Sequence, residues 1–231
     1  MTKRLIAAID TPDRTRARAL IHTVAPYCGL VKLGLEFFLQ HGPEGYQAVV
    51  EQSGADVFLD LKLYDIPNTV AGAVRSLLPL APKLLTIHAS GGAKMIEAAA
   101  QAAAQAGDAR PKILAVTVLT SFDEPGLAET GIQGSTAEQV LRLARLALAA
   151  GADGLVCSPH EISILRDAFG AKPILVVPGI RPAGAALGDQ VRVMTPEQAV
   201  AAGADYIVVG RPITGAADPA AACAEIARSI Q

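Results

Sequence analysis

Short runs of hydrophobic, often β-branched residues recur along the whole chain, with longer amphipathic segments between them. The eight runs are residues 5–9, 30–35, 56–63, 84–89, 113–119, 154–158, 174–179 and 206–210. Runs this short, with few polar residues, are typical of strands that are covered on both faces, as in a parallel sheet. The pattern therefore predicts eight buried strands.

Two of the intervening segments carry clear signals of helix ends. Ser135 precedes one segment, Glu138 follows it by three residues as in a capping box, and Gly151 is placed to end the helix. The segment 195–206 has the same form, with Thr195 as the cap and a proline at the first helical position. Strands and helices therefore alternate along the chain.

Eight strand–helix units in 231 residues, with no linker or break in composition, favour a single (β/α)8 TIM barrel over residues 1–231. The competing fold is a doubly wound open sheet, which usually has a glycine-rich fingerprint after its first strand. Here the first run is followed by "DTPDRTRARAL", which contains no glycine. The barrel is the better prediction.

Composition and charge exclude several classes of protein. No hydrophobic run approaches the ~20 residues that cross a bilayer, and Asp10 ends the first run too early for a signal peptide. We therefore expect no membrane contact and a cytoplasmic location. The net charge of −2, with 4% aromatic residues and no basic stripe, argues against nucleic-acid binding.

The cysteines and histidines give no sign of a disulfide framework or a metal site. Cys28, Cys157 and Cys223 lie far apart and form no C-x-x-C pair, so we interpret them as reduced core thiols. The four histidines are scattered along the chain and show no metal-binding spacing. The sequence therefore predicts no metal.

Asp60 and Lys62 stand two residues apart within the run 56–63, so in a strand their side chains point to the same face. An ion pair on the inner face carries a desolvation cost that apolar residues avoid. A barrel places its active site at the carboxyl ends of its strands, where this pair lies. The pair predicts a functional site, and a purely structural ion pair is the alternative.

Further polar residues lie in or after the other runs, namely Asp10, Lys32, His88, Thr120, Arg181, Gly210 and Arg211. Several of these residues also have structural explanations that involve no ligand. Asp10 is placed to cap a helix opening at Pro12, and Lys32 is long enough to reach out of its strand. His88 fits a hydrogen-bonded supporting residue, and Thr120 fits a turn.

Gly210 and Arg211, followed by a proline that opens a helix, match the phosphate site of this fold. Glycine allows the backbone to approach an anion, while the guanidinium and the helix start supply donors. An ordinary helix start with a surface arginine is the alternative. The segment 180–190 is long for a loop and ends in Gln190, which is consistent with a mobile lid or with disorder.

The stretch "DLKLYDIPNT", residues 60–69, resembles the signature of the orotidine 5′-phosphate decarboxylases. The resemblance covers essentially the whole chain through "AID", "VKLGLEFF", "HASGG", "VTVLTS", "VVPGIRP", "GDQVRVMTP" and "VVGRPIT". The D-x-K-x-x-D core is shared with sugar-phosphate aldolases and decarboxylases of the same superfamily. The continuation "IPNT", with "GIRP" and "GDQ", is more specific.

This resemblance implies decarboxylation of orotidine 5′-phosphate to UMP and CO2, the last step of de novo pyrimidine synthesis, without a cofactor or a metal. It implies that Lys62 stabilises and protonates the carbanion left in the ring. Asp60 and Asp65 hold and polarise that lysine, and Lys32 completes an alternating array of lysines and aspartates.

The resemblance also implies binding roles and a homodimer. The ribose contacts match Asp10, Lys32 and Thr69, the pyrimidine contact matches Thr120, and the phosphate contacts match Arg181, Gln190, Gly210 and Arg211. In the family, the residues at the positions of Asp65 and Thr69 reach into the site of the partner subunit. The implied partners are orotidine 5′-phosphate, UMP and a second copy of the chain.

Two other functions remain open at this point. A magnesium-dependent keto-sugar-phosphate decarboxylase or hexulose-phosphate synthase of the same superfamily would keep Asp60 and Lys62 but needs acidic ligands near the second strand. This chain has Lys32 there, with Glu36 four residues further on. A non-catalytic barrel that binds a phosphate ligand is the other alternative, disfavoured because crowded charges are costly when nothing uses them.

Overall fold

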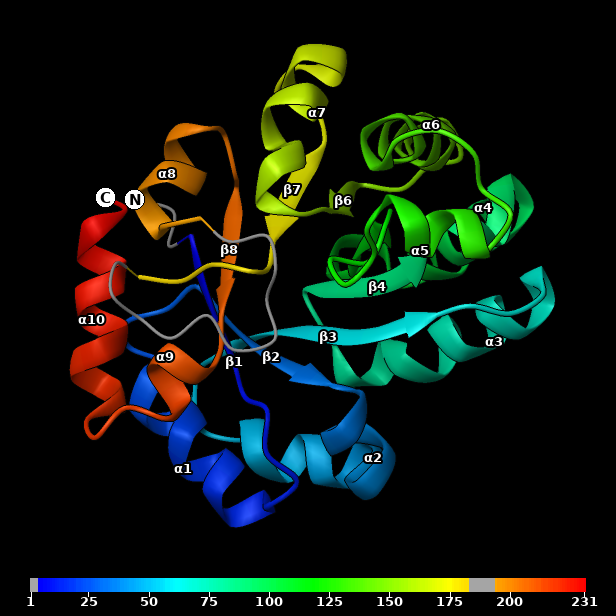
Figure 1. Ribbon diagram of the computed structural model, residues 1–231. Coiled ribbons are helices and arrows are strands. Elements are labelled where there is room, and N and C mark those ends of the chain that lie inside the picture. Colours follow the sequence, from blue (N-terminus) through cyan, green and yellow to red (C-terminus); the bar gives the residue numbers. More distant parts are fainter. Residues whose placement is uncertain (1–3, 183–193) are drawn as a thin grey trace.

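Eight parallel strands close into a barrel in the order of the chain (Figure 1). The computed structural model describes residues 4–182 and 194–231. The strands are β1 (Leu5–Ala8), β2 (Leu30–Gly34), β3 (Asp56–Leu63), β4 (Leu84–His88), β5 (Lys112–Val116), β6 (Gly154–Val156), β7 (Ile174–Val177) and β8 (Tyr206–Val209). Because β1 pairs with both β2 and β8, the sheet has no edge. The predicted barrel is confirmed.

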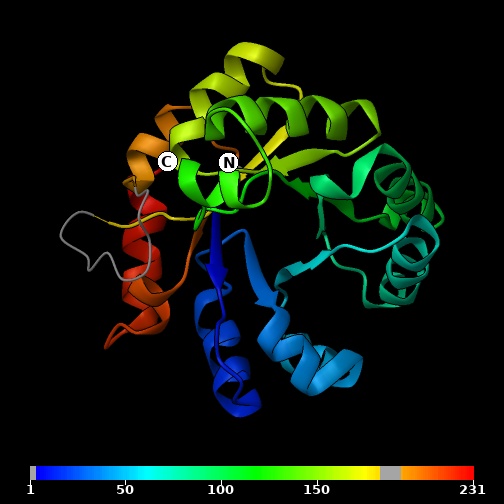
Figure 2. The ribbon, with the colours of Figure 1, turned by 45° about the vertical axis from the view of Figure 1, so that its right-hand side comes forward.

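The helices surround the strands in both views (Figures 1 and 2). They are α1 (Arg14–Val24), α2 (Leu35–Val50), α3 (Pro67–Leu77), α4 (Gly92–Ala104), α5 (Glu124–Glu129), α6 (Thr136–Ala149), α7 (Ile162–Phe169), α8 (Pro196–Ala201), α9 (Arg211–Thr214) and α10 (Pro219–Ser229). Short 3₁₀ helices lie at Leu78–Leu80, Ala89–Gly91, Gly107–Ala109 and Pro159–Glu161. None of the described helices is long and apolar enough to cross a membrane.

The helix caps agree with the sequence in two places and differ in one. Ser135 caps α6 through a capping box with Glu138, and Thr195 caps α8. At α1, however, the cap is Asp13, whose side chain accepts a hydrogen bond from the Arg16 N–H at 3.0 Å. The suggestion that Asp10 caps this helix is therefore wrong, and Asp10 is available for another role.

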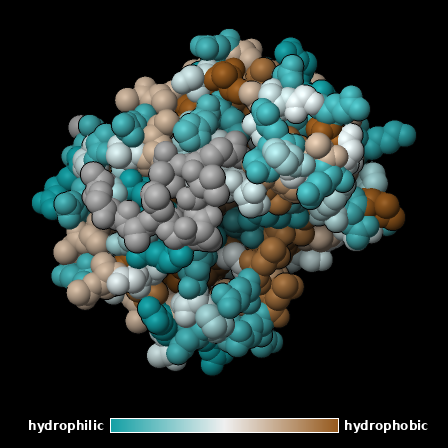
Figure 3. Space-filling model, in the orientation of Figure 1, coloured by the Kyte–Doolittle hydropathy of each residue, from teal (hydrophilic) through white to brown (hydrophobic). Residues whose placement is uncertain are grey.

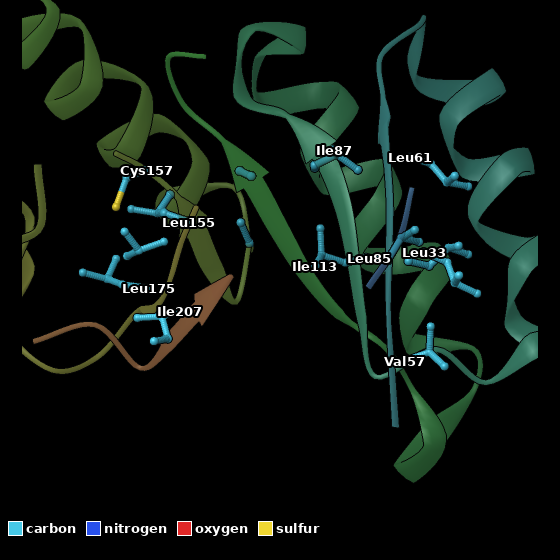
Figure 4. Close-up of a cluster of buried hydrophobic side chains, with 14 of the residues drawn as sticks. Leu33, Val57, Leu61, Leu85, Ile87, Ile113, Leu155, Cys157, Leu175 and Ile207 are labelled. Atoms are coloured by element: carbon cyan, nitrogen blue, oxygen red, sulfur yellow. The ribbon is translucent and has the colours of Figure 1, made fainter. Parts of the chain in front are cut away.

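Alternation along the strands separates two hydrophobic layers. The inner cluster fills the barrel and contains Ile6, Ala8, Leu30, Phe58, Leu84, Leu114, Val176 and Val208. The larger outer cluster packs the strands against the helices; Figure 4 labels Leu33, Leu85 and Leu155 within it. Side chains two residues apart share a face, so Lys32 lies above Leu30 and Asp60 above Phe58. The apolar barrel interior thus carries a charged layer at its carboxyl end.

Candidate active site

Lys32, Asp60 and Lys62 meet inside the barrel at the ends of β2 and β3. Oδ2 of Asp60 lies 2.8 Å from the Lys62 Nζ and 3.6 Å from the Lys32 Nζ. The side chain of Asp60 is 12% exposed and that of Lys32 is 13% exposed. One buried carboxylate oxygen is therefore shared between two ammonium groups.

Asp10 extends this cluster from β1 toward solvent. Its Oδ1 lies 3.2 Å from the Lys32 Nζ, and its side chain is 60% exposed. The alternation of charge therefore runs from Asp10 through Lys32 and Asp60 to Lys62, across three neighbouring strands. Lys32 turns inward toward two carboxylates, so the suggestion that it merely reaches out of its strand is wrong.

Lys62 reaches Asp60 from an irregular part of β3. The φ angle of Lys62 is 49°, in the left-handed region that non-glycine residues rarely adopt. The register between β3 and β4 also shifts between Leu59 and Leu63. The two side chains do meet, as the sequence predicted, but regular strand alternation is not the whole reason.

Thr86 of β4 belongs to the cluster and was missed by the sequence analysis. Its hydroxyl donates to Oδ1 of Asp60 at 2.9 Å and accepts from the backbone N–H of Lys62 at 2.9 Å. A signal was present in the sequence, because Thr86 follows the inward-facing Leu84 by two residues and so shares its face. A lone threonine in a buried strand cannot be assigned to the site from the sequence alone, because its contact with Asp60 is visible only in the structure.

The surroundings of Asp60 favour its ionised form. Burial alone would raise its pKa, but the charges of Lys32 and Lys62 and the hydrogen bonds from Lys62 and Thr86 outweigh burial. The pKa of Asp60 is therefore below its usual value. The carboxylate is a fixed negative charge that holds two positive ones.

His88, at the end of β4, lies at the edge of the cluster. Burial lowers the pKa of His88 and the charge of Lys62 lowers it further, against the opposing effect of Asp60. Its ring packs against that of Tyr64, with centroids 5.7 Å apart. The lowered pKa favours the neutral imidazole, and a hydrogen-bonded supporting role for His88 stays a prediction.

Two cavities share the charged cluster as a common wall, since Lys32, Asp60 and Lys62 line both. One cavity, of about 160 Å³, is otherwise mainly apolar, with Val118, Leu119, Thr120, Cys157 and Pro178 among its lining residues. The other, of about 200 Å³, is lined by Asp10, Thr11 and Glu36 among others. The arrangement suits a ligand with a flat, weakly polar part on one side and hydroxyl groups on the other.

Two arginines lie near each other beyond the ends of β7 and β8. Burial lowers the pKa of Arg181, and the positive charge of Arg211 lowers it further. Gly210 precedes Arg211, and a Cβ there would come within 3.4 Å of the Asp10 Oδ2. Two guanidinium groups that feel each other's charge are suited to bind an anion. Gln190, expected at the same place, lies outside the described residues.

The described part of the chain contains no group of three His, Cys, Asp or Glu side chains that is placed to hold a metal ion. Between the carboxylates of Asp10 and Asp60 lies the ammonium of Lys32, at 3.2 and 3.6 Å. A cation of the chain itself therefore takes the place that a metal would need there.

Comparison with known proteins agrees with this geometry. The family model described as "Orotidine 5'-phosphate decarboxylase / HUMPS family" matches residues 3–226. The chain belongs to this family. It is 54% identical over 230 residues to a protein of Gluconobacter oxydans (strain 621H) named orotidine 5′-phosphate decarboxylase, which covers 98% of this chain and 97% of that protein.

Further relatives in the family carry the same name. A protein of Anaeromyxobacter sp. (strain K) is 52% identical over 229 residues, with 99% of each chain covered. The crystal structure of orotidine 5′-phosphate decarboxylase from Lactobacillus acidophilus superposes with a TM-score of 0.88 at 38% identity, again with 99% of each chain covered. The similarity therefore includes every strand that contributes to the charged cluster.

Two residues of the family signature lie outside the cluster. Asp65 and Thr69 are exposed, and within the described residues Asp65 forms no ion pair with Lys32 or Lys62. Its carboxylate accepts a hydrogen bond from the neighbouring Ile66 N–H at 2.6 Å. A single chain of this family member thus joins three members of the expected lysine–aspartate array and leaves the fourth at the surface.

We expect the pKa of the Asp60 carboxyl to rise when an ammonium group is removed. In Lys62→Met, the loss of one charge and one hydrogen bond leaves burial less opposed, so the pKa moves upward. Carbon-13 NMR of labelled aspartate, recorded as the pH is lowered, measures it. Lys83→Met, which removes a lysine from the exposed 4.0 Å pair with Asp56, is the control and leaves Asp60 unchanged. An Asp60 pKa in the unsubstituted protein at or above its usual value would contradict the assignment.

Proposed function

We propose that this chain converts orotidine 5′-phosphate to UMP and CO2, as the last step of de novo pyrimidine synthesis. The observation that carries the proposal is the sharing of one buried Asp60 oxygen between Lys32 and Lys62 beside an apolar cavity. Its support is the 54% identity to a protein named for this activity. A cytoplasmic location remains part of the same proposal.

The chemistry needs a fixed positive charge. When the bond from the ring carbon to the carboxylate breaks, the electron pair stays in the plane of the pyrimidine ring, where the π-system does not spread it. A preorganised ammonium in a site with little water stabilises such a charge. Lys62 then donates a proton to the carbon, a C–H bond forms, and the resulting amine regains a proton from solvent.

In this proposal, the contact with Asp60 positions the Lys62 ammonium for the proton transfer. The 2.8 Å contact holds the ammonium beside the cavity that both residues line. Lys32 contacts the same carboxylate and also Asp10, so it links the reacting centre to the cavity where ribose hydroxyls would lie. Thr120 lines the other cavity, where the pyrimidine would lie.

The magnesium-dependent alternative fits this chain less well. Glu36, Asp10 and Asp60 line one cavity, which is the acidic environment that a metal would need. The ammonium of Lys32 is already within 3.6 Å of two of these carboxylates, however, and would repel a divalent cation. The same packed charges argue against a barrel that only binds a phosphate ligand, because their burial is costly without a use.

We further propose that the chain acts as a homodimer in which Asp65 and Thr69 complete the partner's site. Both residues are exposed, and Asp65 lies between two exposed apolar residues in the chain, Tyr64 and Ile66. Leu35, Leu39, Tyr64 and Ile66 are 44%, 78%, 63% and 66% exposed. Figure 3 shows hydrophobic residues at the surface between α2 and the end of β3. An exposed apolar surface of this kind suits contact with a second copy.

The first prediction from the proposed function concerns Lys62. We expect the purified protein to convert orotidine 5′-phosphate to UMP, and Lys62→Ala to lower kcat by many orders of magnitude, because it removes both the stabilising charge and the proton. UMP binding changes far less, since UMP does not carry the charge that develops in the reaction. Chromatographic detection of UMP measures kcat, and calorimetric titration measures the binding of UMP. A variant that keeps a tenth of the kcat would reduce Lys62 to a binding residue.

The second prediction concerns the phosphate. Arg211→Ala is expected to lower kcat/KM by about 10²-fold or more, since a charge-assisted contact to phosphate is lost. Turnover of orotidine, which lacks the phosphate, stays nearly unchanged. Arg142→Ala, which removes an exposed arginine from the outer helix α6, is the control and leaves both rates as they are. Equal losses on the two substrates would show that Arg211 has a structural role instead.

The third prediction concerns the shared site. Lys62→Ala and Asp65→Ala homodimers are each nearly inactive, but mixing, dissociation and reassociation make about half of the dimers mixed. Each mixed dimer has one site with both native residues, so activity recovers to roughly a quarter of the unsubstituted level. Native mass spectrometry verifies that mixed dimers have formed. With that control, absence of recovery would remove Asp65 from the partner's site.

A further inference from the structure

We propose that Thr86 is a positioning residue whose hydroxyl couples the backbone turn at Lys62 to the orientation of the Asp60 carboxylate. Its effect on the rate rests on the proposed function, whereas its effect on Asp60 does not. Thr86 lies on β4, is fully buried, and contacts both residues of the pair.

The need for Thr86 arises from a bulge in β3. Leu59 pairs with Leu85, and the next pair joins Leu63 to Ile87. Three residues of β3, from Asp60 to Lys62, therefore lie opposite the single residue Thr86 of β4. A bulge of this kind leaves backbone groups without a partner in the strand ladder. The N–H of Lys62 is such a group, and the Thr86 hydroxyl accepts its hydrogen bond at 2.9 Å.

The same hydroxyl fixes the carboxylate. A hydroxyl group has one proton, and with its oxygen accepting from Lys62 that proton points to Oδ1 of Asp60, 2.9 Å away. Oδ1 is thereby engaged, and Oδ2 is left to face Lys62 at 2.8 Å and Lys32 at 3.6 Å. The terminal torsion of an aspartate is broad by itself. Thr86 therefore selects the rotation in which one oxygen serves both ammonium groups.

The hydroxyl also holds a strained backbone. Lys62 has a φ of 49°, and a lysine in the left-handed region persists only when its surroundings hold it there. The hydrogen bond to Thr86 is the contact that holds its N–H in this conformation. Without it, Lys62 relaxes toward ordinary strand geometry and its Nζ moves relative to the substrate.

Thr86→Val tests this role, because it keeps the shape of the side chain and replaces the hydroxyl with a methyl group. We expect kcat to fall by about 10²-fold, the loss associated with a misplaced catalytic group. Binding of UMP stays within about threefold, since the cavity keeps its walls. Thr86→Ser retains the hydroxyl and is expected to remain within about threefold of the unsubstituted kcat.

The pH profile separates positioning from packing. The ionised and titratable groups around Asp60 are Lys32 on β2, His88 on β4 and Lys62 of its own strand, with Asp10, which follows β1, in contact with Lys32. These are unchanged in both variants. Loss of the Thr86 hydrogen bond raises the pKa of Asp60, so the acid limb of kcat/KM moves to higher pH in Thr86→Val and not in Thr86→Ser. A packing defect alone would lower Tm and leave this limb in place.

Three results would overturn the proposal: an unchanged kcat in Thr86→Val, an unchanged acid limb, or equal damage in Thr86→Ser. If Thr86→Val does not fold, Thr86→Ala, which adds no methyl group, takes its place with the same expectations. Carbon-13 NMR of Asp60 gives a reading that needs no turnover. If the unsubstituted protein does not decarboxylate orotidine 5′-phosphate, the proposed function fails, while a raised Asp60 pKa in Thr86→Val still supports the coupling.

Discussion

The site depends on the cost of burying a carboxylate in a barrel filled with hydrophobic side chains. An unpaired charge at the position of Asp60 would not be tolerated, and removing one partner of a buried pair is strongly destabilising. Lys32, Lys62 and Thr86 all direct donors to this one group. Because the carboxylate must be satisfied, the two ammonium groups are held where a reaction can use them.

The barrel supplies this arrangement through its register. Alternation places Lys32 and Asp60 directly above the apolar layer formed by Leu30 and Phe58, so the walls that exclude water adjoin the charges. The bulge in β3 then brings Lys62 back toward Asp60 in place of the regular continuation of the strand. A rigid sheet thus fixes the charges before any substrate arrives, which is what electrostatic stabilisation of a developing anion requires.

The sequence predicts the barrel and the centre of the site, because strand periodicity and the desolvation cost of an inward ion pair are properties of local sequence. Thr86 and the bulge could not be predicted, because they depend on how β3 pairs with β4, and periodicity assumes a regular strand. By residue type, Asp10 and Asp13 are equally good helix caps. Only the position at which α1 begins, Arg14, decides between them. The roles proposed for Asp65 and Thr69 involve a second chain, so no single-chain pattern determines them.

The central claim is that lysines of the chain supply the positive charge for which related chemistry needs a metal. The most direct measurement is the turnover of orotidine 5′-phosphate to UMP by protein treated with EDTA and then dialysed against metal-free buffer. The account predicts the same kcat before and after treatment, and no increase when Mg²⁺ is added. Loss of turnover on treatment, with recovery on addition of Mg²⁺, would contradict it.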